Sequence, residues 1–317
     1  MAGIVAVASA VADTPLWLRY PAISPDGSTI AFCYQGDIFT VPSSGGAAKR
    51  ITTNPAYDYM PVWSPDGRSI AFASDRNGNM DVYVVSAEGG VPRAVTVNSV
   101  NETPVLFIDN DHILYSASML PDRKDIQFPS GQFPQLYKIP VTGGRPVMFS
   151  SLAMENLSVN PVDGTILYND KKGYEDTWRK HHRSSITRDI WSCAPDAKSS
   201  FKKLTDFAGE DRNPVWAPDG KSYYFLSERD GSFNVYKSSP GKAVERLTRH
   251  DRHPVRFLSS SDKGLLCYSY DGELYTLAEG CEPSKVSVSI VSDVVERSVF
   301  ARNLRSGASD VSVSPSG

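Results

Sequence analysis

The sequence predicts an all-β fold, a six-bladed β-propeller of four-stranded antiparallel blades. One observation is a repeated third-strand signature, a polar residue followed by an aliphatic and an aromatic residue. Its six copies are Asp37-Ile38-Phe39, Asp81-Val82-Tyr83, Gln135-Leu136-Tyr137, Asp189-Ile190-Trp191, Asn234-Val235-Tyr236 and Glu273-Leu274-Tyr275. A second observation is a turn containing Pro and Gly upstream of most copies, at residues 24–27, 64–67, 160–164 and 217–220. Repetition of one unit at this length indicates a ring of blades.

The spacing of the repeats agrees with this fold. Pro25 and Pro65 lie 40 residues apart, as do Pro218 and Leu258. A blade of four strands takes about 40 to 50 residues. Longer intervals indicate a blade plus an insertion, and we expect insertions at residues 119–134 and 171–188.

The second copy shows how the elements of a blade can be assigned. We expect strands at residues 60–64, 69–74, 81–86 and 93–96. In the first turn, Pro65 presets φ, Asp66 bonds its own backbone and Gly67 takes the positive φ that follows. The same structural roles fall to Asp26 and Gly27, to Asp163 and Gly164, and to Asp219 and Gly220.

The composition of the strands indicates which faces are covered. Residues 30–34, 82–85 and 223–226 are nearly continuous apolar runs. Such runs indicate strands buried on both faces, whereas a two-layer sandwich gives a cleaner alternation of apolar and polar residues. Stacked blades therefore explain the pattern better than a sandwich does.

The ends of the chain suggest further segments. Residues 1–12 are small and apolar and end in Ala10-Val11-Ala12, the pattern of a signal-peptidase site. We expect residues 1–12 to be a residual signal peptide and the mature protein to be periplasmic or otherwise exported. A basic n-region is missing, so an N-terminal extension of a cytoplasmic protein is the alternative.

We expect the propeller at 13–292, with residues 285–291 completing the sixth blade and no strand borrowed from the N-terminus.

A seventh turn, Ser314-Pro315-Ser316-Gly317, stands at the other end of the sequence. We expect residues 293–317 to be a linker and the first strand of a following repeat domain, most simply a second propeller. In this interpretation the chain is cut at the start of that domain. Other domains of the same longer chain are then its first partners.

Composition excludes several classes of protein. The 33 Lys and Arg residues are balanced by 36 Asp and Glu residues, for a net charge of −3, which argues against a nucleic-acid surface. A run of about 18 apolar residues is absent, so we expect no membrane span. The four cysteines form no CxxC motif, and their pairing stays open.

A search for chemistry predicts no catalytic, cofactor-binding or metal-binding residues. The Gly-x-Ser-x-Gly motif of a nucleophile elbow fails at the last position in residues 307–311. His250 and His253 form H-x-x-H without an evident third ligand for zinc. Residues 75–81 resemble a calcium loop but lack its Gly and Glu positions, so a hairpin turn explains them better.

The insertion at residues 171–188 is the best candidate for a binding function. It gathers cationic and aromatic side chains that could contact the carboxylate end of a peptide or a partner surface. The candidate contacts are Trp178, Arg179, Lys180, His181, His182 and Arg188. The alternative is a rim loop held by Trp178 with its charges in water.

Three features carry a family resemblance. The Ser-Pro-Asp-Gly turns resemble the repeats of TolB-like propellers. Residues 174–182, leading through Thr187-Arg188 to Asp189-Ile190-Trp191, and the opening residues 14–21 look like the N-terminal part of bacterial tricorn-type serine peptidases. That resemblance implies a six-bladed propeller followed by a seven-bladed propeller, a PDZ module and a peptidase domain.

The resemblance carries no catalytic residue onto this chain, because the peptidase domain lies elsewhere in such proteins. It implies a non-catalytic role in admitting or releasing peptides and in assembly. The implied partners are peptides or unfolded polypeptide, and a homo-oligomer is possible. Two alternatives stay open: a TolB-like periplasmic protein-binding scaffold, and the propeller of a prolyl-oligopeptidase-like peptidase.

Overall fold

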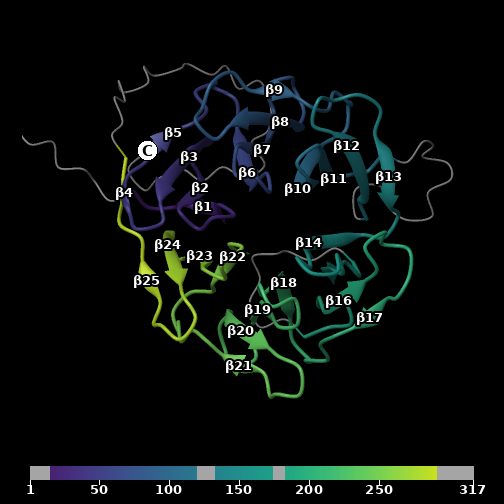
Figure 1. The fold of residues 1–317 in the computed structure, drawn as a ribbon, viewed down its shortest axis with the longest axis vertical. Helices are drawn as coiled ribbons and strands as arrows, with labels where there is room; N and C mark the ends of the chain where they lie inside the picture. Colours follow the sequence, from purple (N-terminus) through teal and green to yellow (C-terminus); the bar gives the residue numbers. More distant parts are fainter. Residues whose placement is uncertain (1–14, 120–132, 174–182, 291–317) are drawn as a thin grey trace, which may run out of the picture.

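The protein forms a ring of six four-stranded antiparallel sheets around a central axis (Figure 1). The structure, a computed structural model, describes residues 15–119, 133–173 and 183–290. The predicted six-bladed β-propeller is confirmed. The expected signal peptide at 1–12 and the expected linker at 293–317 lie outside the described residues.

Each blade is a meander whose strands follow the sequence from the axis outward. Blade 1 holds β1 (Arg19–Ile23), β2 (Thr29–Tyr34), β3 (Asp37–Pro42) and β5 (Lys49–Arg50). Blade 2 holds β6 (Asp58–Trp63), β7 (Ser69–Ser74), β8 (Asp81–Ser86) and β9 (Arg93–Ala94). Blade 3 holds β10 (Glu102–Asp109), β11 (His112–Ala117), β12 (Gln135–Pro140) and β13 (Val147–Ser150).

The second half of the ring repeats this order. Blade 4 holds β14 (Met154–Val159), β15 (Ile166–Asp170), β16 (Ile190–Cys193) and β17 (Lys202–Lys203). Blade 5 holds β18 (Asp211–Trp216), β19 (Tyr223–Ser227), β20 (Asn234–Ser238) and β21 (Glu245–Arg246). Blade 6 holds β22 (Arg256–Ser260), β23 (Leu266–Tyr270), β24 (Glu273–Leu277) and β25 (Ser284–Lys285).

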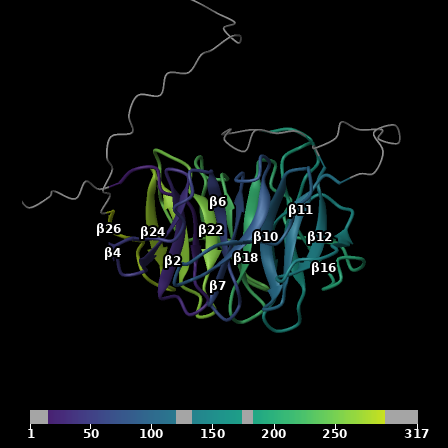
Figure 2. The ribbon, with the colours of Figure 1, turned by 90° about the horizontal axis from the view of Figure 1, so that it is seen from above.

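The disc has two faces, seen edge-on in Figure 2. One face, called here the Pro-Asp face, carries the turns between the first and second strands, such as residues 24–27 and 64–67. The other, called the insertion face, carries the links between the second and third strands. Both expected insertions fall in such links, between β11 and β12 and between β15 and β16.

Burial between blades forms the core, as the apolar runs predicted. Every residue of β19 is buried, and so are the central residues of β2 and β7. Phe225 of blade 5 packs in one cluster with Leu167 and Ile190 of blade 4, so each sheet covers its neighbour. The stability of the ring therefore rests on contacts between blades.

The Pro-Asp turns are tied to their own backbone. Asp26 accepts hydrogen bonds from the Ser24 hydroxyl at 2.6 Å and from the Ser28 amide at 3.0 Å. These bonds lower the pKa of Asp26 to about 2, so the carboxylate stays charged and the turn stays closed at any physiological pH. Asp66, Asp163 and Asp219 accept equivalent bonds from the residues that follow them.

We predict that Gly220→Ala destabilises the protein several times more than Gly67→Ala. Both glycines end a Pro-Asp-Gly turn with positive φ, 62° and 69°. An added Cβ at Gly220 would meet Val162 at 2.6 Å and Asn160 at 2.7 Å, whereas at Gly67 the nearest atom is 3.8 Å away. We expect about 1 kcal/mol for Gly67→Ala from backbone strain and about 2–4 kcal/mol for Gly220→Ala, which adds overpacking.

Denaturant unfolding of the two variants measures this difference. Equal losses of unfolding free energy would show that blades 4 and 5 are not in contact at this turn.

The first strand of every blade contains a bulge, which the sequence did not reveal. In blade 2 the register shifts between Tyr59 and Val62, so β6 begins at Asp58, two residues earlier than expected. Five bulges hold a residue with positive φ, and these residues are Tyr20, Met60, Asn156, Asn213 and Phe257. A bulge bends its strand and leaves one residue outside the hydrogen-bond ladder. The bulged residues all line the central cavity.

Among the described residues, blade 6 takes all four of its strands from one stretch of the sequence, residues 256–285. The outer strand of blade 6 is β25, shorter than the expected 285–291, because the chain then leaves blade 6. Residues Val288–Ser289 (β26) pair in parallel with β4 (Gly46–Ala47) of blade 1. The Gly46 amide donates to Ser287 O at 2.8 Å, and Val288 is buried in the cluster of blade 1.

Two further expectations concern cysteines and membranes. All four cysteines are free, and three of them are buried. Burial raises the pKa of the Cys33 and Cys193 thiols to about 11, so neither is a reactive thiolate at neutral pH. Within the described ranges, none of the chain forms a helix able to cross a membrane.

Candidate functional site

A central cavity of about 730 Å³ runs between the first strands of the six blades. The bulged segments of the first strands make up its wall. The residues that the bulges leave outside the hydrogen-bond ladder therefore line the cavity. Non-glycine residues with positive φ store strain, and such positions concentrate at sites of function. The cavity is therefore the first candidate site.

One side of the cavity is aromatic. Tyr20 of blade 1 lies 4.5 Å from Phe257 of blade 6, measured between ring centroids. Tyr20 also lies 5.6 Å from Tyr59 of blade 2, edge to face. Burial is the largest cause that raises the pKa of the Tyr20 hydroxyl, to about 12, so this hydroxyl is neutral at pH 7.

The opposite side, at the insertion face, carries a cluster of charges from blades 4 and 5. We call it the channel cluster: Glu155, Lys171, Arg188, Glu210 and Arg212. Arg188 Nε lies 2.7 Å from Glu155 Oε2, and Arg188 Nη1 lies 3.3 Å from Glu210 Oε1. Glu155 also pairs with Lys171 at 3.3 Å, and Glu210 with Arg212 at 3.6 Å. Glu228 accepts from the Glu210 amide at 3.4 Å and also acts on Arg212, so the three cations meet three carboxylates.

Burial makes these pairs unusual. The side chain of Arg188 is only 3% exposed, and that of Glu210 only 5%. Burial acts to raise the pKa of Glu155, but Arg188 and then Lys171 outweigh it, and the pKa falls below its usual value. Arg212 lies 4.0 Å from the Phe233 ring centroid, and burial lowers its pKa. The cluster places paired charges inside a partly apolar cavity.

The structure brings one of the predicted contact residues to this site. Arg188 lines the cavity and joins blades 4 and 5. Trp178, Arg179, Lys180, His181 and His182 lie outside the described residues, so their contact role stays a prediction. Lys172, from the same insertion, pairs with Asp170 and Asp189.

Other sequence candidates have structural roles. His250 stacks on Tyr270 with ring centroids 3.9 Å apart, and its Nε2 lies 3.0 Å from the Tyr268 hydroxyl. Burial lowers the pKa of His250, so it is neutral at pH 7. His253 lies 3.2 Å from Asp271 instead of beside His250. Residues 75–81 form the hairpin between β7 and β8, in which Asp75 accepts from the Tyr57 amide.

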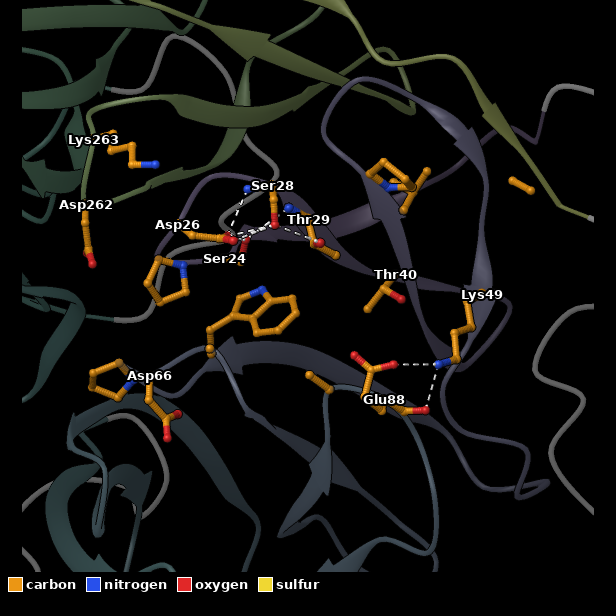
Figure 3. Close-up of a pocket in the computed structure, with 18 residues that line it drawn as sticks. Ser24, Asp26, Ser28, Thr29, Thr40, Lys49, Asp66, Glu88, Asp262 and Lys263 are labelled. Carbon is orange, nitrogen blue, oxygen red and sulfur yellow. Dashed lines mark hydrogen bonds and ion pairs between the residues drawn. The ribbon is translucent and has the colours of Figure 1, made fainter.

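A second hollow, of about 780 Å³, lies on the Pro-Asp face between blades 1 and 2 (Figure 3). The Trp63 indole lies in it, and its nitrogen donates to Ala22 O at 2.9 Å. Lys49 and Glu88 span its outer end at 3.3 Å, and both are exposed. Asp26 and Asp66 line it, but their carboxylate oxygens accept hydrogen bonds within their own turns. This groove contains structural groups and no arrangement suited to catalysis among the residues drawn.

Sequence reasoning missed Glu155, Glu210 and Arg212 as members of a site. Glu155 is 33 residues from Arg188, and Glu210 is 22 residues from it. Only the ring geometry brings them together. A signal that could have found them is the charged residue at or near the start of the first strand in several blades, as in Asp58, Glu102, Asp211 and Arg256.

The ring of blades and its lined central cavity define the protein as a β-propeller domain. Residues 15–282 match the family described as tricorn protease N-terminal beta propeller domain, and the chain belongs to this family.

Relatives agree with this assignment. The chain is 27% identical over 280 residues to tricorn protease homolog 1 of Streptomyces coelicolor, covering 87% of this chain and 25% of the relative. The crystal structure of the tricorn protease superposes with a TM-score of 0.71 at 20% identity, covering 88% of this chain and 27% of that chain. TolB from Acinetobacter baumannii superposes with a TM-score of 0.58 at 17% identity, covering 87% of this chain and 68% of that chain. The chain therefore spans about a quarter of the tricorn-type relatives, and TolB shares the fold.

Proposed function

We propose that this chain is the non-catalytic propeller region of a longer tricorn-type protease, and that its central channel gates the passage of extended peptides. Family membership supports the first part, and the two-sided channel supports the second. In keeping with the sequence expectation for residues 1–12, we place this action in an exported compartment. Contacts with other domains of the longer chain belong to the same proposal.

The observation that carries the proposal is the opposition of an aromatic side and a charged, arginine-containing side within one channel. Tyr20 and Phe257 offer apolar contact to side chains of a threaded peptide. Arg188 and Arg212 sit opposite, where a peptide carboxylate can compete with Glu210 for their guanidinium groups. An unfolded segment fits such a passage better than a folded domain, because the cavity is only about 730 Å³.

Chemistry within the described residues gives no second function. Burial raises the pKa of the Cys33 and Cys193 thiols, and His250 is held by tyrosines. Cleavage would then require groups supplied by another part of a longer protein. The propeller would select and orient what reaches them.

Fluorescence anisotropy with labelled extended peptides tests the proposal. Val105 of β10 lines the channel, so Val105→Trp should narrow it and weaken peptide binding at least tenfold. The matched control is Val244→Trp, because Val244 is exposed in blade 5, away from the channel. Equal affinity of both variants and the wild type would contradict the channel function. Circular dichroism confirms that both variants keep the fold.

A further inference from the structure

The blades follow a charge rule at the first residue of the third strand or, in blade 4, at the residue just before it. A carboxylate there is bridged by a cation on the fourth strand of the same blade. The pairs are Asp37 with Arg50 at 2.5 Å, Asp189 with Lys203 at 2.9 Å, and Glu273 with Lys285. In each case the cation pairs in register with the aromatic residue two positions after the carboxylate. Blades 3 and 5 carry neutral amides, Gln135 and Asn234, at this position.

Blade 2 breaks this rule. Asp81 occupies the carboxylate position and is only 2% exposed. The register partner of Tyr83, two residues on, is Ala94. An alanine therefore stands where the other carboxylate-bearing blades place an arginine or lysine.

A second charge rule applies at the start of the first strand. Asp58 is held by Arg76 at 2.9 Å, and Asp211 by Arg229 at 3.0 Å. In both blades the arginine follows by two residues the serine that pairs with the aspartate, Ser74 or Ser227.

Blade 3 breaks this second rule. Glu102, which is 1% exposed, pairs with Ala117, and two residues later stands Met119. The position that holds arginine in blades 2 and 5 is therefore methionine beside Glu102, and the position that holds a cation in blades 1, 4 and 6 is alanine beside Asp81.

The two deviant carboxylates meet at the junction of blades 2 and 3. Their side chains hydrogen-bond each other, Asn79 Nδ2 donates to Asp81 at 3.3 Å, and burial raises the pKa of both carboxyl groups. Glu102 also acts on the Tyr115 hydroxyl, whose pKa is raised mainly by burial. Gln135 lies on the same face of blade 3 as Glu102, separated only by Ala117.

Oxygen atoms without a partner gather at this junction. Within the described chain, Glu102 Oε2, Tyr115 Oη and Gln135 Oε1 are buried without a hydrogen-bond partner. A buried acceptor left unsatisfied costs about 1–3 kcal/mol. The junction thus combines two contacting carboxyl groups, paired with no cation among the described residues, with unused oxygen atoms, and both features favour a bound cation.

We propose that Asp81, Glu102, Tyr115 and Gln135 form a binding site for a calcium ion. All four side chains offer hard oxygen atoms, which suit calcium and not zinc. Calcium takes 6–8 oxygen ligands in irregular geometry, and water can complete the shell. The described residues hold no group of three or more His, Cys, Asp or Glu side chains arranged for a metal, so neutral oxygens are essential to this site. The hydrogen bond from Asn79 to the carbonyl of exposed Asn98 places the junction just beneath the surface.

Isothermal titration of EDTA-treated full chain with calcium chloride tests the proposal, together with thermal melts. We expect saturable binding, and at a hundredfold excess over the Kd a rise in Tm of at least about 5 °C. Magnesium at the same concentration should give a smaller rise, because it demands a tighter octahedral shell. Glu102→Gln keeps the shape of the side chain and should abolish the calcium response.

A second variant supplies the cation internally. Ala94→Arg places a guanidinium where Arg50 stands in blade 1. It should raise Tm in EDTA and remove the calcium response, whereas Val244→Arg, on the surface of blade 5, should do neither.

Two results would overturn the calcium site. One is the absence of both binding and a shift in Tm. The other is a calcium-independent protein whose stability falls as pH rises, because carboxyl groups of raised pKa lose their stabilising proton in that direction. A shared proton would then neutralise the pair.

Discussion

Arg188→Ala is expected to lower the free energy of unfolding by about 3–5 kcal/mol, because it leaves Glu155 and Glu210 without the cation between them. Glu210 is almost fully buried, so water cannot replace the lost partner. Repulsion between the two carboxylates adds to the cost. The same change removes one of the three cations from the channel cluster.

Urea unfolding of the variant measures the loss. Arg188→Lys keeps the positive charge but cannot bond Glu155 and Glu210 at once as the guanidinium does. It should therefore be more stable than Arg188→Ala and less stable than the wild type. The control is Lys49→Ala, which breaks an exposed pair with Glu88 and should cost less than about 1 kcal/mol. If Arg188→Ala and Lys49→Ala are equally stable, the channel cluster is not buried in solution.

Phe225→Ala is expected to cost about 3–5 kcal/mol, the usual range for a phenylalanine removed from a packed core. The ring of Phe225 is fully buried between blade 5 and blade 4, where Leu167 and Ile190 contact it. Its loss leaves a cavity between sheets that are each held by their own hydrogen bonds and cannot easily approach.

Phe201→Ala provides the matched comparison. Phe201 lies in the link before β17 and is 42% exposed, so its loss should cost no more than about 0.5 kcal/mol. Chemical denaturation of the two variants, monitored by tryptophan fluorescence, gives both values. Similar small losses would contradict the claim that packing between blades holds the ring together.

The fold was predictable because its signals are local and repeated. Turns such as Ser64 to Gly67 fix where strands end, and runs such as residues 223–226 show that both faces are covered. The signature ending in Tyr83 or Tyr236 marks the third strand. These features depend on neighbouring residues, which a sequence displays directly.

The bulges could not be predicted, because Tyr20, Met60 and Phe257 are bulky residues that rarely adopt positive φ. Tertiary packing imposes that conformation against the local preference. Proline follows both Tyr20 and Met60. Because proline donates no hydrogen bond to a strand ladder, these prolines were a sign in the sequence that the ladder is interrupted there.

The candidate site was only partly predictable for a related reason. Arg188 was identified within a cationic segment, but its partners come from β14 and from the residue before β18. Such contacts follow from the order of blades around the axis. Once the ring is known, the exceptions Ala94 and Met119 stand out, because the other blades show which cation each position usually carries.

Photo-crosslinking offers the most direct test of the central claim that the channel receives peptides. An extended peptide carrying benzoylphenylalanine is bound to the full chain, irradiated and mapped by mass spectrometry. The account predicts crosslinks at the bulged residues of the first strands, such as Met60, Asn156 and Phe257, and their loss in Val105→Trp. Crosslinks confined to the outer strands or to the groove beside Trp63 would contradict it.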